Sequence, residues 1–143
     1  MIKGGGGALL REKVVAHRSR LVAIVVDPSK LVRVLGVAFR LPVEVVSFAW
    51  RPVLRALEGM GGNGSLRAMR GEVYVTDNGN SILDVAFAGG IPDPPALERE
   101  IDAIPGVVES GLFVGLADVL YVGQPHGVET RDLGGARGAG LGA

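Results

Sequence analysis

The chain has 143 residues, 48% of them apolar, which suffices for one globular domain or two small ones with a hydrophobic core. Basic and acidic residues balance at 15 each, so no overall charge attracts nucleic acid or a membrane. Cysteine is absent and histidine occurs twice, which excludes disulfides and thiol chemistry and argues against a Cys- or His-rich metal site. No apolar run approaches the about 20 residues of a membrane span, and the glycine-rich start is not typical of a signal peptide, so we expect a cytoplasmic protein.

The first feature along the chain is a run of glycines at 4–7, followed by residues that favour a helix over 8–20. Glycine loses the most backbone entropy on ordering, so the run predicts a tight loop. A loop that opens a helix places free N–H groups and the positive end of the helix dipole at one point, which suits an anion. Lys3 adds a charge there, and Glu12 lies about one turn into the helix. Together they could move a proton next to a carbonyl.

The same pattern also fits a flexible connector followed by a glutamate that only balances the helix dipole. The loop matches neither a Walker A pattern nor a spaced GxGxxG motif. The local pattern therefore leaves both interpretations open.

Residues 21–26 form a continuous, mostly β-branched run, which predicts a strand buried on both faces of a parallel sheet. The strand ends at Asp27-Pro-Ser-Lys30, and open α/β sheets bind ligands at the loops after their strands. Lys30 is therefore expected at the same edge of the sheet as the glycine loop, although a solvated surface lysine also fits. Asp27 is expected to cap the turn.

Between 41 and 113 the pattern predicts the order β-α-β-β-α-β, which suggests a ferredoxin-like module. The expected strands are 41–48, 72–76, 81–87 and 107–113, with an uncertain one at 65–70, and the expected helices are 49–60, ended by glycines, and 92–104. Asp93 is the candidate N-cap of the second helix. Asp84 is expected to face outward or to bond the 77–80 turn, whose Asn-Gly pair is a hairpin signal. Phe48 and Trp50 are expected in the core or in an interface.

Residues 117–123 and 128–130 predict a last hairpin, with His126 as a loop residue in its turn. This hairpin is expected to return to the sheet begun by the 21–26 strand. The glycine- and alanine-rich end, 134–143, has no core to join and is expected to be disordered.

Five blocks of the sequence together resemble one known family. They are Lys3-Gly-Gly-Gly with Arg11-Glu-Lys13, Asp27-Pro-Ser-Lys30, Leu41-Pro-Val-Glu-Val45, Thr76-Asp-Asn-Gly-Asn80 with Ile82-Leu-Asp84, and Ile104-Pro-Gly-Val-Val108 with Gly111-Leu-Phe113. Their order and spacing are similar to those of type A ribose-5-phosphate isomerase, and the likeness extends from the first residues to about Val128. Five ordered blocks are far more specific than any one of them.

The resemblance implies an α/β fold, the remnant of a Rossmann-like parallel sheet domain with an inserted ferredoxin-like (βαββαβ) α+β domain. Residues 1–40 would belong to the Rossmann-like catalytic domain and 41–113 would form the ferredoxin-like domain. Residues 114–133 would return to the catalytic domain, and 134–143 would be the disordered tail.

The resemblance also implies a function, the interconversion of D-ribose 5-phosphate and D-ribulose 5-phosphate through an enediolate in the pentose phosphate pathway. It implies a homodimer or homotetramer that binds a small sugar phosphate and needs no metal or organic cofactor. Glu12 matches the family's general base. The groups that hold the substrate oxygens are matched by Lys3, Gly4, Gly5 and Gly6, and Lys30 matches a substrate-binding lysine.

The departure from the family lies at the start of the chain. Family members begin with a half that supplies a phosphate loop and an acidic Asp-Gly-Ala-Asp-Glu block, and neither occurs here. The chain therefore looks like the C-terminal part of the enzyme. Two classes of function remain: an isomerase of which this chain is a part, and a non-catalytic remnant whose βαββαβ module only self-associates.

Overall fold

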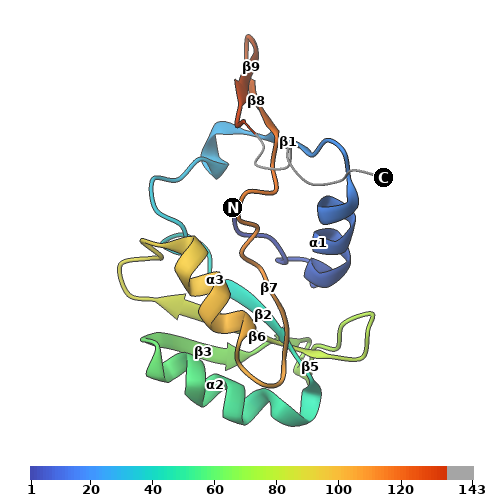
Figure 1. Ribbon diagram of the computed structural model, residues 1–143, viewed down its shortest axis with the longest axis vertical. Coiled ribbons are helices and arrows are strands. Elements are labelled where there is room, and N and C mark those ends of the chain that lie inside the picture. The colour runs from blue at the N-terminus through green and yellow to red at the C-terminus, as the bar shows by residue number, and fades with distance from the viewer. Residues whose placement is uncertain (135–143) are drawn as a thin grey trace.

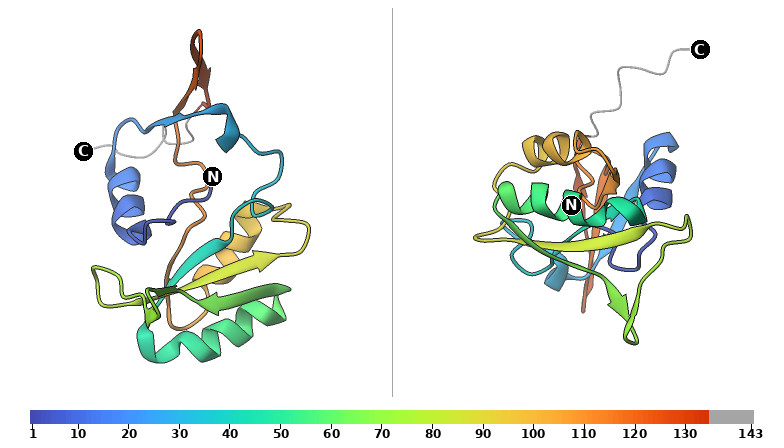
Figure 2. Two further views of the ribbon diagram at one scale, coloured as in Figure 1. Left: turned by 180° about the vertical axis from the view of Figure 1, so that it is seen from behind. Right: turned by 90° about the horizontal axis from the view of Figure 1, so that it is seen from below.

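The computed structural model describes residues 1–134, which form two main β-sheets and three α-helices (Figure 1). The elements in chain order are α1 (Leu9–Arg18), β1 (Ala23–Val26), the short 3-10 helix η1 (Pro28–Lys30), β2 (Leu41–Val45), η2 (Ser47–Ala49), α2 (Trp50–Gly59), β3 (Gly62–Leu66), β4 (Ala68–Met69), β5 (Glu72–Val73), β6 (Ser81–Phe87), α3 (Pro94–Asp102), β7 (Val107–Ser110), β8 (Val119–Gln124) and β9 (Gly127–Asp132). Figures 1 and 2 show β1, β8 and β9 at one end of the molecule and the larger sheet with α2 at the other.

The larger sheet has four strands in the order β3-β6-β2-β7, and every neighbouring pair is antiparallel. This order and the β-α-β-β-α-β sequence of elements are those of a ferredoxin-like fold, as predicted. Asp93 caps α3 as expected, because its Oδ1 accepts a hydrogen bond of 3.0 Å from the Ala96 N–H.

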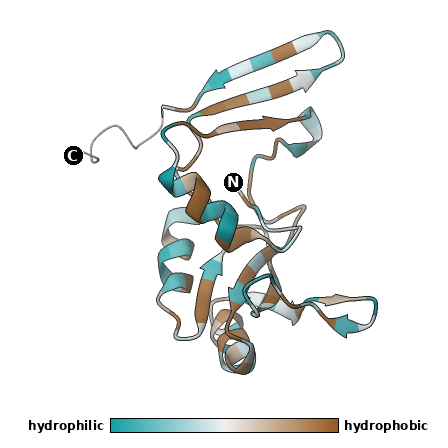
Figure 3. Cartoon of the chain, turned by 90° about the vertical axis from the view of Figure 1, so that its right-hand side faces the viewer, coloured by the Kyte–Doolittle hydropathy of each residue, from teal (hydrophilic) through white to brown (hydrophobic). Residues whose placement is uncertain are grey.

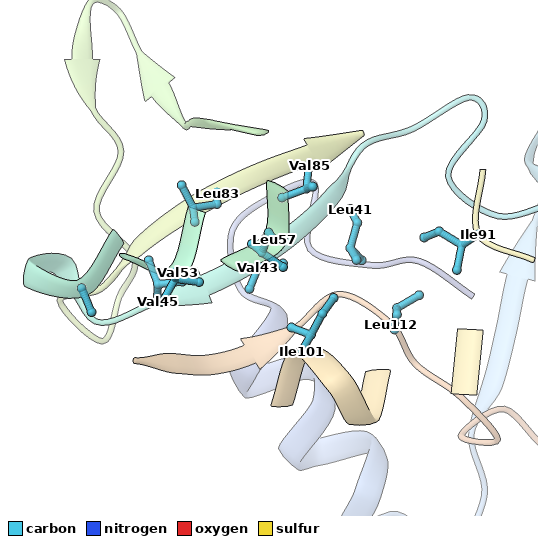
Figure 4. Close-up of a cluster of buried hydrophobic side chains, with 11 residues drawn as sticks. Leu41, Val43, Val45, Val53, Leu57, Leu83, Val85, Ile91, Ile101 and Leu112 are labelled. Carbon is cyan, nitrogen blue, oxygen red and sulfur yellow. The ribbon is translucent and has the colours of Figure 1, made fainter. Parts of the chain in front are cut away.

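The hydrophobic core lies between this sheet and its two helices (Figure 4). Alternate residues of β2, among them Val43, meet Leu57 of α2 and Ile101 of α3 in one cluster. Both helices therefore cover the same face of the sheet. All five residues of β2 are buried, so the opposite face of this strand is covered as well.

The second strand of this sheet is not where the sequence predicted it. The expected pair was 72–76 with 81–87, and the glycines after α2 were assigned to the end of that helix. The structure instead pairs β3 with β6, whereas residues 68–73 form the separate β4–β5 hairpin. Of the predicted pairing, a single antiparallel bridge between Val75 and Ser81 forms across the Asn-Gly turn. Glycine is needed in β3 because α2 packs closely against it. A Cβ on Gly64 would lie 2.8 Å from Leu54 Cδ1, and one on Gly62 would lie 2.9 Å from the Leu57 carbonyl oxygen.

The smaller sheet has the order β1-β8-β9, with β1 parallel to β8 and β8 antiparallel to β9. The last hairpin therefore returns to the strand that follows α1, as predicted. The expectation that this strand is buried on both faces is wrong, because its residues alternate between exposed and half-buried, and Val25 is 74% exposed. Within residues 1–134, β1 pairs with β8 alone. Figure 3 shows that β1 and β8 are nonetheless mostly hydrophobic.

Two further findings concern the ends of the chain and its helices. The predicted disordered tail, 134–143, lies outside the described residues apart from Gly134. Across residues 1–134, none of the helices combines the length and the apolar character that crossing a membrane requires.

Candidate active site

The first three residues pair with the segment that follows β7, and this pairing fixes Lys3. The Lys3 N–H donates to the Gly111 carbonyl at 2.9 Å, and Ile2 forms a β-bridge with Leu112. A Cβ on Gly111 would collide with the Lys3 carbonyl oxygen, so this close approach requires glycine. The backbone of Lys3 is thereby anchored to the four-stranded sheet.

The glycine loop is a closed turn in which the Gly7 N–H donates to the Gly4 carbonyl at 3.0 Å. Gly4 and Gly7 have φ of 97° and 88°, which other residues rarely adopt. Gly5 and Gly6 differ from them, because neither has a positive φ and a Cβ on either would meet open space. Their N–H groups donate to no acceptor within residues 1–134. The fold therefore does not need glycine at these two positions, and their amides are available to a ligand.

Helix α1 begins directly after this loop and carries Glu12 in its first turn. The Glu12 carboxylate lies 3.2 Å from Lys3 Nζ, and the two side chains are 40% and 33% exposed. Lys3 Nζ also lies 5.9 Å from the centre of the Phe113 ring. An ion pair this exposed adds less than about 1 kcal/mol to stability. The contact can therefore open at little cost when a ligand enters.

Lys30 closes η1 at the end of β1. Asp27 caps this turn as predicted, and hydrogen bonds from the Ser29 side chain and backbone lower the pKa of Asp27. Lys30 Nζ lies 5.3 Å from the centre of the Phe39 ring. Lys30 and Lys3 line the same cavity, which has a volume of about 1120 Å³ and also includes Asp27 in its wall.

The predicted site residues thus fall into two groups that share Lys3. Lys3 and Lys30 line one cavity, and Lys3 also contacts Glu12 beside the glycine loop. Neither Glu12 nor the three glycines at 4–6 line the cavity that contains Lys30. They lie beside Lys3, which belongs to both groups: it contacts Glu12 and forms part of the cavity wall. Residues 1–134 contain no cluster of three His, Asp or Glu side chains placed to hold a metal ion.

The polar turn at 77–80 connects α1 to the four-stranded sheet. Arg11 of α1 donates from Nε to Asn78 Oδ1 and from Nη2 to the Asp77 carbonyl, both at 3.2 Å. On the other side, Glu44 Oε1 accepts hydrogen bonds from side chains of the turn, at 2.9 Å from Thr76 Oγ1 and 3.3 Å from Asn78 Nδ2. Glu44 is fully buried in β2. The turn thereby fixes the helix that carries Glu12, a role that the Asn-Gly signal alone did not reveal.

Sequence reasoning also missed Arg67, whose guanidinium contacts the glycine loop. Asp84 accepts from Arg67 Nε at 2.8 Å and from Nη2 at 2.6 Å, so it bonds this arginine and not the 77–80 turn. The available signal was Asp84 itself, because a carboxylate inside an apolar strand requires a partner. Nothing in the spacing identified Arg67 as that partner.

Comparison with known proteins adds independent findings. Residues 1–127 match the family described as Ribose 5-phosphate isomerase A (phosphoriboisomerase A). The chain is 51% identical over 129 residues to "Ribose-5-phosphate isomerase A" of Thermomicrobium roseum, covering 90% of this chain and 54% of that protein. It is 53% identical over 138 residues to the protein of the same name from Chloroflexus aurantiacus, covering 94% of this chain and 57% of that protein.

Solved structures agree with this. The chain superposes with a TM-score of 0.87 and 46% identity on ribose 5-phosphate isomerase A from Methanocaldococcus jannaschii, covering 92% of this chain and 58% of that one. A D-ribose-5-phosphate isomerase in complex with phospho-erythronic acid gives a TM-score of 0.88 at 36% identity, with the same coverage. The chain spans about half the length of the curated relatives it matches. On this evidence, it belongs to the ribose 5-phosphate isomerase A family.

Proposed function

We propose that this chain supplies one side of the active site of an isomerase that interconverts D-ribose 5-phosphate and D-ribulose 5-phosphate. The observation that carries the proposal is the contact between Lys3 and Glu12 at 3.2 Å, next to a loop whose Gly5 and Gly6 amides have no acceptor within residues 1–134. A carboxylate base beside a cation and free N–H groups is what proton transfer through an enediolate requires.

In this proposal Glu12 removes the proton from C2 of the open-chain aldose. The electron pair of the C2–H bond forms a C1–C2 double bond, and the carbonyl oxygen on C1 takes the negative charge. Lys3 and the N–H groups of Gly4, Gly5 and Gly6 stabilise this charge. Glu12 then returns the proton to C1, a proton passes from the oxygen on C2 to the oxygen on C1, and the C2 carbonyl forms. Substrate and product are isomers, so the reaction needs no oxidant, and we propose none and no cofactor.

Lys30 is proposed to bind the substrate away from the reacting carbons. Support comes from its place in the wall of the cavity that Lys3 also lines, while Glu12 does not line it. A sugar phosphate carries a dianion at one end, and a lysine is a suitable point charge for it. The complex of a structural neighbour with phospho-erythronic acid agrees with a sugar phosphate as the class of ligand.

We further propose the domain division 1–40, 41–113 and 114–133, with homo-oligomers formed through the second unit. The two separate sheets support the division. Phe48, which is 90% exposed beside α2, supports a subunit contact there, whereas the neighbouring Trp50 packs against the core. Sedimentation velocity of the complete protein tests whether it forms homo-oligomers, and a strictly monomeric, active enzyme would contradict that proposal. A cytoplasmic location stays a prediction.

The function is tested in a complete chain, made by joining these residues to the N-terminal part of the Chloroflexus aurantiacus relative. The assay follows conversion of ribose 5-phosphate deuterated at C2. Proton transfer by one carboxylate predicts that turnover slows and that part of the deuterium appears at C1 of the ribulose 5-phosphate. A well-folded complete chain without turnover would favour the non-catalytic, self-associating alternative.

A further inference from the structure

Arg67 holds the glycine loop against the four-stranded sheet. Its Nη1 donates to the carbonyl oxygens of Gly4 and Gly5, at 3.0 and 3.1 Å. Its Nε and Nη2 donate to the two oxygens of Asp84 on β6. The guanidinium is therefore held in plane by a bidentate carboxylate while its remaining edge faces the loop. The Arg67 side chain is 14% exposed, so little water competes for these bonds.

Tyr74 continues this contact at the next residue of the loop. Its hydroxyl donates to the Gly6 carbonyl at 3.3 Å, and the Arg67 guanidinium lies 5.8 Å from the centre of its ring. A Cβ on Gly7 would collide with the same hydroxyl, so the loop and the tyrosine fit closely. Three consecutive loop carbonyls are thus bound by two side chains of the ferredoxin-like unit.

This contact determines which way the loop amides point. In a trans peptide the C=O and the following N–H point in opposite directions, and residues 1–134 contain no cis peptide. The carbonyls of Gly4 and Gly5 are directed to Arg67, so the N–H groups of Gly5 and Gly6 are directed away from it. Neither the Gly5 amide nor the Gly6 amide has an acceptor within residues 1–134.

We propose that Arg67 and Tyr74 are positioning residues, which bind the loop carbonyls so that the Gly5 and Gly6 amides are presented to the substrate oxygens. The inference rests on the proposed function, but it assigns a role to residues that do not touch the substrate. A run of glycines is otherwise free to reorient its peptides. Hydrogen-bond donors stabilise an oxyanion most when they are already oriented before the charge develops. Asp84 serves the same end by orienting Arg67.

The test uses three variants of the complete chain. Arg67→Lys keeps a cation beside Asp84 but lacks the planar set of donors, and Tyr74→Phe removes only the hydroxyl. Arg55→Lys, on the exposed surface of α2, is the matched control. We expect kcat to fall about tenfold to a hundredfold in Arg67→Lys and less in Tyr74→Phe, with KM within about threefold of the parent, because the donors act on the transition state. Arg55→Lys should match the parent.

A second measurement separates positioning from stability. In chains labelled with ¹⁵N-glycine, NMR relaxation reports the order of the Gly5 and Gly6 amides, and the thermal midpoint reports the fold. The proposal expects these two amides to become mobile in Arg67→Lys while the midpoint of Tyr74→Phe stays near the parent. Unchanged loop order in both variants overturns it, and so does a mobile loop with unchanged kcat. If Arg67→Lys fails to fold, Tyr74→Phe alone decides by the same criteria. If the parent lacks turnover, the proposed function fails, and the loop order alone then decides the positioning.

Discussion

At the scale of single residues, Glu12 is the side chain whose removal should matter most. Glu12→Gln keeps the shape and leaves an amide oxygen for Lys3 Nζ, but the amide cannot accept the C2 proton. We expect kcat of the complete enzyme to fall on the order of a hundredfold to ten-thousandfold, with KM nearly unchanged. Glu58→Gln, at the exposed end of α2, is the control. Steady-state kinetics decide, and turnover within a few-fold of the parent would show that Glu12 is not the base.

Lys30 should behave differently, because it lines the cavity without contacting Glu12. Lys30→Ala removes a charge from the wall of the cavity and leaves the Lys3–Glu12 contact intact. We expect KM for ribose 5-phosphate to rise more than kcat falls. Arg33→Ala removes an exposed cation from the same segment and is the control. A loss confined to kcat would place Lys30 at the reacting carbons instead.

Sequence reasoning at this scale succeeded where contacts are local and failed where they are not. The place of Lys30 after a strand and of Glu12 in a first helical turn follows from short patterns. Arg67 lies more than sixty positions after the loop whose carbonyls it binds. Its role depends on how β6 and the loop come together, and a single sequence does not contain that information.

At the scale of elements, the glycine loop offers a matched pair of substitutions. Gly7→Ala places a methyl group at φ of 88° and against the Tyr74 hydroxyl, so it should cost about 1–3 kcal/mol of stability. Gly5→Ala has neither problem and should leave the thermal midpoint unchanged. It should nevertheless lower kcat/KM on the order of tenfold to a hundredfold, because the methyl group hinders close approach of the substrate to the amides. Full activity of Gly5→Ala would show that the substrate does not approach the backbone there.

A second element-scale prediction concerns the contact of α1 with α3 and β7. Lys13 of α1 binds Glu98 at 3.0 Å and Glu109 at 2.6 Å, and burial, then the Glu109 charge, raises the pKa of nearby Asp102. The folded chain therefore binds a proton on the Asp102 carboxylate more tightly than the unfolded chain does. The stability it contributes is present below the unfolded pKa of about 3.8 and is lost as pH rises through the higher, folded pKa.

Asp102→Asn should consequently stabilise the complete protein at neutral pH but not in acid. The gain should be below about 1 kcal/mol, because Asp102 is partly exposed and solvent screens its charge. Thermal midpoints measured between pH 4 and pH 7 would show the difference from the parent growing with pH. Glu100→Gln, on the exposed side of α3, should show no such trend. A difference that is constant with pH would contradict the electrostatic cause.

The elements themselves were predictable to the extent that each has its own hydrophobic pattern. Helices α2 and α3 and strands β2 and β6 carry such patterns and were found near their expected positions. Most of strand β3 was missed, and only its last two residues fall in the uncertain strand expected at 65–70. The strand begins with two glycines in its first three residues, which weaken any strand signal and are explained only by the close packing of α2. The burial of β1 was overestimated because its apolar sequence does not reveal what covers it.

At the scale of the whole molecule, the two main sheets differ in how many buried residues they contribute to the hydrophobic core. The main cluster of buried residues comes from the ferredoxin-like unit, with members from Leu41 to Leu112. The smaller sheet contributes little, since every residue of β9 is exposed and Val25 of β1 is 74% exposed. Stability should therefore be unequal. In hydrogen exchange of the 143-residue chain, we expect the amides of β2 and β6 to exchange slowly and those of β1 and β9 to exchange quickly.

The same imbalance leads to a prediction for these 143 residues expressed alone. Val15 and Leu21 are 65% and 67% exposed, β1 has an unpaired edge within residues 1–134, and the formal net charge is zero. An apolar edge without charge repulsion favours association, so the product should be poorly soluble or partly molten. It should also lack isomerase activity, because binding energy from the non-reacting end of the substrate normally orients the reacting carbons, and under the proposed function these residues supply only one side of the pocket. The measurement is ribulose 5-phosphate formation by the short chain and by the complete chain under identical conditions. Robust turnover by the short chain would mean that its own residues complete the site, and Asp27, which already lines the cavity with Lys3 and Lys30, would be the first to examine.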